Sequence, residues 1–151
     1  MEIKELKKIL HEGIYSCVIY NNGTVRTFSQ KGVIDLYTLL KNELSFLEGA
    51  IVADKVIGKA AAAILIIGKV KSVYANIISC NALTLLSEAG IETQFGQEVP
   101  FIQNRNQTDC CPLEKNCYKE KSTEKIVEII EIFINSIKNE KTKESINIKN
   151  K

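Results

Sequence analysis

Hydrophobic and polar residues follow helical and then strand periodicity along the first part of the chain. Apolar residues recur at helical spacing over 3–10, and Gly13 can end that helix. Residues 14–20 are rich in β-branched and aromatic side chains. Asn22-Gly23 is a strong hairpin signal, so a second strand is expected over 24–28. The sequence therefore predicts a helix followed by a β-hairpin.

The most apolar stretch, residues 49–68, predicts the centre of the fold. It indicates a short strand over 50–53, a turn at Asp54 and then a helix that is apolar almost all round. Such a helix has no polar face for water and must be buried. The alanines over 60–63 add little bulk, so a sheet or another helix can approach this helix closely.

Three further elements flank this central stretch. A helix with one apolar face is predicted over 33–43, and a buried strand is predicted over 72–78. The helix that follows should cover 79–89. Ser79 is suited to its N-cap, and Gly90 stands just past its end.

Residues 91–95 and 99–102 are typical of two short strands. The link between them, residues 96–98, is too short for a parallel crossover, so the two strands should form an antiparallel hairpin. Pro112 is suited to the first position of a short helix, because proline is well tolerated there.

The last part of the chain predicts a long helix and a tail. Ser122 is a plausible N-cap, and apolar residues at spacings of three and four over 126–137 form an amphipathic stripe. The polar remainder, 139–151, has too little apolar surface to pack and is predicted to be disordered. The expected organisation is one domain over 1–138, with its C-terminal helix over 122–138.

Composition narrows the classes of protein and partner. A chain of 151 residues suits one domain with a sizeable core, and a net charge of +2 does not indicate nucleic acid or a membrane as a partner. The longest apolar run, 60–67, is far shorter than a membrane span, and no signal segment is seen at the start. We therefore expect a cytoplasmic protein. Five cysteines, an odd number, then favour free thiols over disulfides.

One segment resembles a known superfamily. Residues 73–91 are similar to the strand and helix that carry the second zinc motif, Pro-Cys-x-x-Cys, of cytidine-deaminase-like proteins. Ser79-Cys80 stands where that motif has Pro-Cys, and Leu83 stands where it has the second Cys. The first zinc motif, His-x-Glu or Cys-x-Glu, falls near residues 53–56, which are Ala-Asp-Lys-Val. The chain thus resembles the zinc-less branch of this superfamily, a small prokaryotic family of unknown function.

The resemblance covers roughly residues 14–115. The remaining matches are the run 53–62, Val99-Pro100 with Asn104-Arg105, and Cys111-Pro112 followed by Glu114-Lys115. The order of the elements predicts a three-layer α/β/α sandwich with a mixed sheet. The resemblance implies that this sandwich is cytidine-deaminase-like, with an added C-terminal helix.

Zinc chemistry is not expected. A zinc deaminase needs three protein ligands and a glutamate that shuttles protons. Of those ligands the chain offers at most Cys80, and its single histidine, His11, lies at the end of the first helix. Cys110, Cys111 and Cys117 have a spacing that is uncommon for zinc, and a fourth ligand is missing. We predict no metal and no cofactor.

Two interpretations of the charges at the start of the central helix stay open. In the first, the helix dipole stabilises the Asp54 carboxylate, and the side chains of Lys55 and Lys59 extend to water. Alternatively, the starts of this helix and of the helix at Ser79 form one anion-binding site, because helix N-termini offer free N–H groups. Asn104 and Arg105 would complete that ligand site or simply be solvated.

Three functions follow from these alternatives. The first is a domain that binds a small molecule, such as the nucleoside or nucleotide that the resemblance implies. The second is a metal-independent thiol enzyme or redox sensor that uses Cys80 or Cys111, each placed at a helix start where a thiol pKa can fall. The third is a non-catalytic interaction module, in which the isoleucine stripe of the last helix docks a second subunit. A homodimer is left open.

Overall fold

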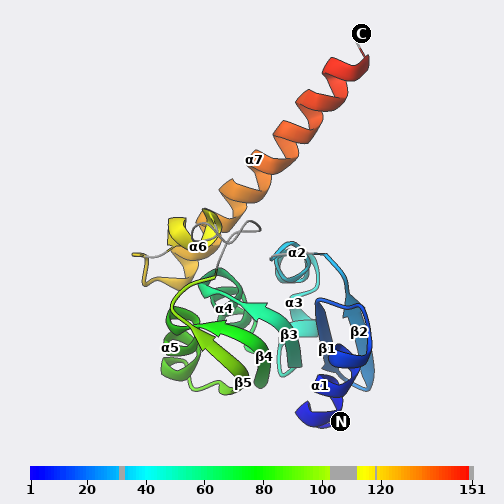
Figure 1. Cartoon of the computed structure of the whole chain (residues 1–151), viewed down its shortest axis with the longest axis vertical. Helices are drawn as coiled ribbons and strands as arrows, with labels where there is room; N and C mark the ends of the chain where they lie inside the picture. The colour runs from blue at the N-terminus through cyan, green and yellow to red at the C-terminus, as the bar shows by residue number, and fades with distance from the viewer. Residues whose placement is uncertain (31–32, 103–111, 118, 150–151) are drawn as a thin grey trace.

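A mixed five-stranded sheet with strand order β2-β1-β3-β4-β5 runs through the domain, and helices cover both of its faces (Figure 1). The computed structural model describes residues 1–30, 33–102, 112–117 and 119–149. The strands are β1 Cys17–Asn21, β2 Thr24–Phe28, β3 Ile51–Ile57, β4 Ser72–Ser79 and β5 Glu92–Val99. The helices are α1 Ile3–Glu12, α2 Ile34–Asn42, α3 Leu44–Leu47, α4 Lys59–Ile67, α5 Cys80–Glu88, α6 Pro112–Cys117 and α7 Thr123–Lys149. The predicted three-layer α/β/α architecture is confirmed.

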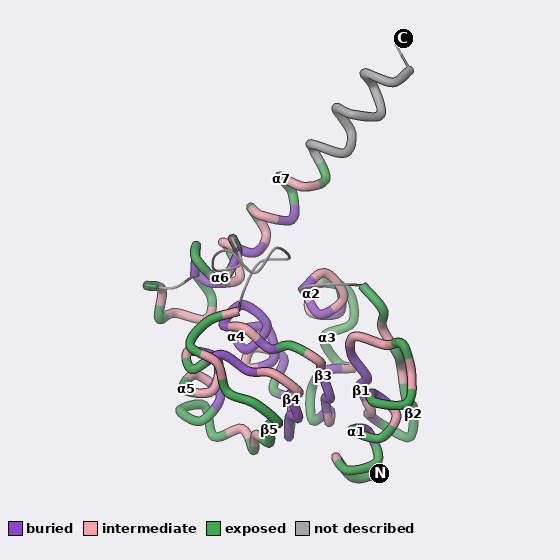
Figure 2. Tube along the Cα trace, viewed as in Figure 1, coloured by how far each residue is buried: buried purple, intermediate pink, exposed green. Residues whose placement is uncertain are grey.

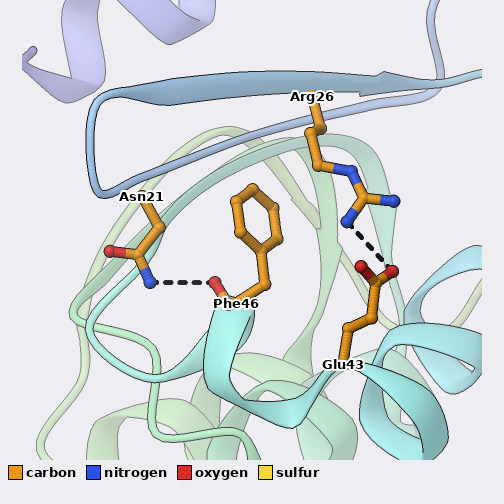
Figure 3. A network of polar contacts seen from close by, with 4 residues as sticks. All are labelled: Asn21, Arg26, Glu43 and Phe46. Atoms are coloured by element: carbon orange, nitrogen blue, oxygen red, sulfur yellow. Dashed lines mark hydrogen bonds and ion pairs between the residues drawn. The ribbon is translucent and has the colours of Figure 1, made fainter.

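The β1–β2 hairpin turns at the predicted residues and is then fixed to α3. Asn22 and Gly23 have φ of 50° and 78°, as a tight type I′ turn requires. Asn21 Nδ2 donates to the carbonyl oxygens of Phe46 at 2.9 Å and Glu48 at 2.8 Å. From β2, Arg26 pairs with Glu43 at 3.0 Å and lies over the Phe46 ring (Figure 3). The short helix α3 has no counterpart among the elements predicted from the sequence.

Each face of the sheet has its own core. On one face α1 packs Leu6 and Leu10 against Val18, Ala53 and Tyr74. The larger core lies on the other face, beneath α4, α5 and the start of α7. Figure 2 shows β3, β4 and α4 as the most continuously buried part of the chain. The prediction that the helix after the central strand is buried is therefore confirmed.

The central strand is longer than predicted. β3 continues through Asp54 to Ile57, and α4 begins only at Lys59, after Gly58. The reason is tertiary: Val56 and Ile57 pair in parallel with Ile77 and Ile78 of β4, which holds these β-branched residues in the sheet. The expected turn and helix start at Asp54 are wrong.

The predicted C-terminal hairpin is also wrong. Residues 92–99 form the single strand β5, which pairs in parallel with β4, and α5 supplies the crossover. Gly96 looked like a turn residue, but it lies where β5 approaches β4 closely. A Cβ at this position would stand 2.9 Å from the Asn76 carbonyl oxygen, so only glycine fits without a shift of the backbone.

Helix α7 packs its predicted stripe against its own domain and then extends away from it (Figure 1). Ile126, Ile130 and Ile134 are buried in the larger core. The helix continues to Lys149, where a disordered tail was expected. The segment after Lys138 contains no Gly or Pro and is rich in Lys and Glu, which are good helix formers. Within the described ranges, no helix is both long and apolar enough to cross a membrane.

Candidate functional site

The carboxyl ends of β3 and β4 meet at one edge of the sheet, and two helices begin there. Because β3 and β4 are parallel, α4 starts at Lys59 beside α5, which starts at Cys80. The start of α2 is close as well, because α2 contacts α4. Helix α6 and the first turns of α7 also pack on α4 (Figure 1). This arrangement makes the edge the candidate site.

Asp54 is the buried acid of this edge. It lies in β3 between Cys17 of β1 and Ala75 of β4 in the strand register. Only 8% of Asp54 is exposed. The Val56 backbone N–H donates to Asp54 Oδ1 at 3.2 Å, and the Cys17 thiol is close enough to the carboxyl group to affect its pKa. The sequence placed Asp54 at a helix start, but the structure places it inside the sheet, facing the larger core.

Burial changes the protonation of both groups. Desolvation raises the pKa of Asp54 to about 7, although its hydrogen bonds from Val56 and Cys17 oppose the rise. The carboxyl of Asp35, at the start of α2, adds a smaller repulsion. Desolvation, followed by the charge of Asp54, raises the pKa of the Cys17 thiol well above its usual value. Asp54 can therefore accept or release a proton near neutral pH, whereas Cys17 stays a neutral thiol.

Lys55 and Lys59, which the sequence placed together at the start of the central helix, lie on different elements. Lys55 follows Asp54 in an extended strand, which directs its side chain to the opposite face of the sheet. Lys59 is the first residue of α4 and is 5% exposed, on the same side of the sheet as Asp54. Hydrogen bonding from the Ser122 N–H lowers the pKa of Glu120, and Lys59 contributes to that shift, so Lys59 lies near the start of α7.

Ser79 is the N-cap of α5, as predicted. Its Oγ accepts from the Ala82 backbone N–H at 3.2 Å, and the residue is fully buried. Ser79 therefore lies at this edge of the sheet, and its hydroxyl oxygen is used to cap the first turn of α5. Helix α4 has Gly58 at its N-cap, and glycine has no side chain that could cap the first turn.

The cysteines separate into two environments. Cys80, the first residue of α5, is exposed, whereas Cys17 and Cys117 are buried. Cys110 and Cys111 lie outside the described residues, as do Asn104 and Arg105, so their predicted roles stay predictions. Among the residues that the structure describes, no three His, Cys, Asp or Glu side chains gather in a group that could hold a metal ion.

Sequence reasoning missed Cys17 and Asp35 as members of this site. Both reach Asp54 through long-range packing, one from the antiparallel strand β1 and one from the start of α2. The signal that was present in the sequence is a single acid inside the most apolar stretch of the chain. A strand interpretation of residues 51–57 would have placed that acid within the sheet.

Comparison with known proteins identifies the family. No curated protein matches the chain. A crystal structure of a DUF1893 family protein (TM1506) from Thermotoga maritima is similar, with a TM-score of 0.79 and 29% identity, covering 85% of this chain and 86% of that one. RibD from Acinetobacter baumannii is more distant, with a TM-score of 0.41 and 18% identity, covering 62% of this chain and 33% of that one. The family model described as "TM1506: Domain of unknown function (DUF1893)" matches residues 5–134, and the chain belongs to this family.

Proposed function

We propose that the edge formed by β3, β4, α4 and α5 binds a small molecule, with Asp54 as the group that contacts it. The nucleoside or nucleotide class of the ligand comes from the resemblance of residues 53–62 and 73–91 to cytidine-deaminase-like proteins. Fold analogy alone carries that part of the proposal.

The observation that carries the proposal is the ionisable carboxyl of Asp54 in a buried position. A carboxyl whose pKa is raised to about 7 by burial reduces the stability of the fold near neutral pH. An asparagine would fill nearly the same volume and keep one acceptor oxygen without the cost of ionisation. Groups that reduce stability in this way are concentrated at functional sites.

The chemistry of the edge suits a ligand with two kinds of group. Asp54 accepts a hydrogen bond from a ligand hydroxyl or amine when ionised, and donates one to a ligand carbonyl or ring nitrogen when protonated. The N-terminal end of α4 and the Lys59 ammonium favour a negative group. A nucleoside monophosphate combines both. Inorganic phosphate alone would contact only the start of α4 and Lys59, and would not use Asp54.

A thermal-shift screen tests the proposal. The probes are nucleosides, nucleoside monophosphates and inorganic phosphate, measured on the wild type, Asp54→Asn and Lys59→Gln. A ligand at about 100 times its Kd stabilises the fold by about 2.7 kcal/mol, which for this chain length is a rise of roughly 5–10 °C in Tm. Asp54→Asn should reduce the rise for nucleosides, and Lys59→Gln should reduce it only for phosphorylated probes.

Lys55→Ala is the matched control, because Lys55 adjoins Asp54 in the strand but points to the other face. It should leave every shift unchanged. A Tm that no probe raises would refute the nucleoside or nucleotide class. A shift that Asp54→Asn and Lys55→Ala reduce equally would remove Asp54 from the binding role.

Cys80 supports a second candidate function, a thiol-dependent enzyme or redox sensor. Its side chain is exposed at the first position of α5, at the same edge as Asp54. Cys80→Ser should leave the thermal shifts intact if the edge only binds. It should abolish any peroxide-dependent change in mass if Cys80 is a sensor, and peptide-resolved mass spectrometry distinguishes the two results.

A further inference from the structure

Strand β5 is the last strand at one side of the sheet, and none of the described strands pairs with its outer backbone edge. All its residues from Glu92 to Val99 are exposed or half-buried. The opposite edge strand, β2, is short and is tied to α3 through Arg26 and Glu43. Natural edge strands are commonly protected by lysine or proline, and β5 contains neither. An edge of this kind is a template for pairing with another strand.

We propose that β5 pairs antiparallel with β5 of a second copy of this chain across a two-fold axis, joining the two sheets into one. A two-fold interface is isologous, so the same edge supplies both partners. Strand addition of this type gains its affinity from main-chain hydrogen bonds. This interaction surface, the outer side of β5, is separate from the candidate site, which lies where the carboxyl ends of β3 and β4 meet.

The position of α5 supports a second copy as the partner. Helix α5 contacts both β4 and β5, and we infer that it lies above the gap between these two strands. In the paired sheet, the second α5 would lie above the matching gap, two strand spacings away, at about 10 Å. That distance matches the roughly 8–10 Å at which two helices pack. Strand pairing and helix packing are therefore satisfied together.

Phe95 gives the same surface an apolar component. It pairs with Ala75, whose side chain belongs to the larger core, so Phe95 points to the face that α5 covers. Nevertheless 43% of Phe95 is exposed. Pairing the two edges would cover this ring between α5 and the second α5. The exposed aromatic side chain then has a packing role.

Charge restricts the register of the paired strands. A register centred on Phe95 would set Glu92 opposite Glu98 of the second copy twice, and like charges directly opposite are destabilising. A register shifted toward Gly96 separates these carboxylates.

Sedimentation or light scattering of the full chain tests the proposal, with a reductant present so that the exposed Cys80 forms no disulfide. The edge variant is Gln94→Lys with Gln97→Lys, since both side chains are exposed and lysines on an edge oppose pairing. The matched control is Thr24→Lys with Thr27→Lys, two exposed positions on the other edge strand. Circular dichroism confirms that both variants fold.

The wild type and the control should have the mass of two chains at high concentration, and the β5 variant should have the mass of one. Hydrogen exchange provides a second measurement on the unaltered chain: the β5 amides should lose protection on dilution, while those of β3 stay protected. A wild type that is monomeric throughout, or a β5 variant that stays dimeric, would overturn the proposal. Protection of β5 that does not change on dilution would overturn it as well.

Discussion

Replacing Asp54 by asparagine should change the pH dependence of stability by a predictable amount. The substitution keeps the size of the side chain and its acceptor oxygen but removes the ionisation. The pKa of Asp54 is about 7 in the folded protein, against 3.8 for an ordinary carboxyl group. Between these two values the folded state holds a proton that the unfolded state has released. The stabilising contribution of the protonated carboxyl is therefore complete below the lower pKa and is lost as the pH rises to the higher one.

The size of the effect follows from the two pKa values. One pKa unit corresponds to about 1.36 kcal/mol, so the ionisation of Asp54 costs the wild type roughly 4 kcal/mol in total by about pH 8. The part lost between about pH 5 and pH 8 is roughly 2–3 kcal/mol. Asp54→Asn has no such loss. Its free energy of unfolding, relative to the wild type, should therefore rise by roughly 2–3 kcal/mol over that interval.

Urea unfolding of both proteins at the two pH values measures this difference, and the subtraction removes the contributions of the other titrating groups. Glu128→Gln, an exposed carboxyl on α7, is the matched control and should differ from the wild type equally at both pH values. If the difference between Asp54→Asn and the wild type is independent of pH, water reaches Asp54. The description of this carboxyl as desolvated would then be refuted.

Four further outcomes follow from the packing. Ala62→Leu should cost roughly 1–3 kcal/mol by overpacking, because Ala62 is fully buried on α4; a neutral result in urea unfolding would contradict that packing. Gly96→Ala should cost about 1 kcal/mol or more, since its Cβ would stand 2.9 Å from a backbone oxygen, and an unchanged Tm would count against the close approach. Deleting 145–151 should leave Tm nearly unchanged, because this end of α7 projects from the domain (Figure 1), and a fall of many degrees would mean that it docks. In the native protein, alkylation should modify Cys80 quickly and Cys17 slowly; equal rates by peptide mass spectrometry would show that β1 opens readily.

Local signals in the sequence were sufficient for the elements whose ends are set locally. The Asn22-Gly23 turn and the Ser79 cap each depend on the chemistry of a few neighbouring residues, and the structure has both. The end of β3 depends instead on pairing with β4, which lies some twenty residues further along the chain. Within residues 54–57 the only local strand signal was the β-branched pair Val56 and Ile57, and it follows an acid and a lysine that are also common at a helix start.

The prediction of a hairpin at residues 91–102 was wrong for a related reason. Gly96 lies between the two short strands that the sequence predicted and was interpreted as part of a turn, because glycine often interrupts regular structure. In the fold it is required by the close approach of β4, a contact that the sequence of residues 92–99 does not contain. The parallel pairing then follows from α5, whose length supplies the crossover that a three-residue turn could not.

The difference between local signals and long-range pairing also explains how much of the candidate site could be predicted from the sequence. It identified Asp54 as the one acid in the apolar centre, but an acid at a helix start and an acid inside a sheet have opposite energetic meanings. At a helix start the carboxylate would be stabilised by the helix dipole. Between β1 and β4 it is desolvated instead, and its ionisation reduces the stability of the fold. The charged form of Asp54 therefore costs the sheet stability, and this cost is the reason why we propose that a ligand uses its charge or its proton.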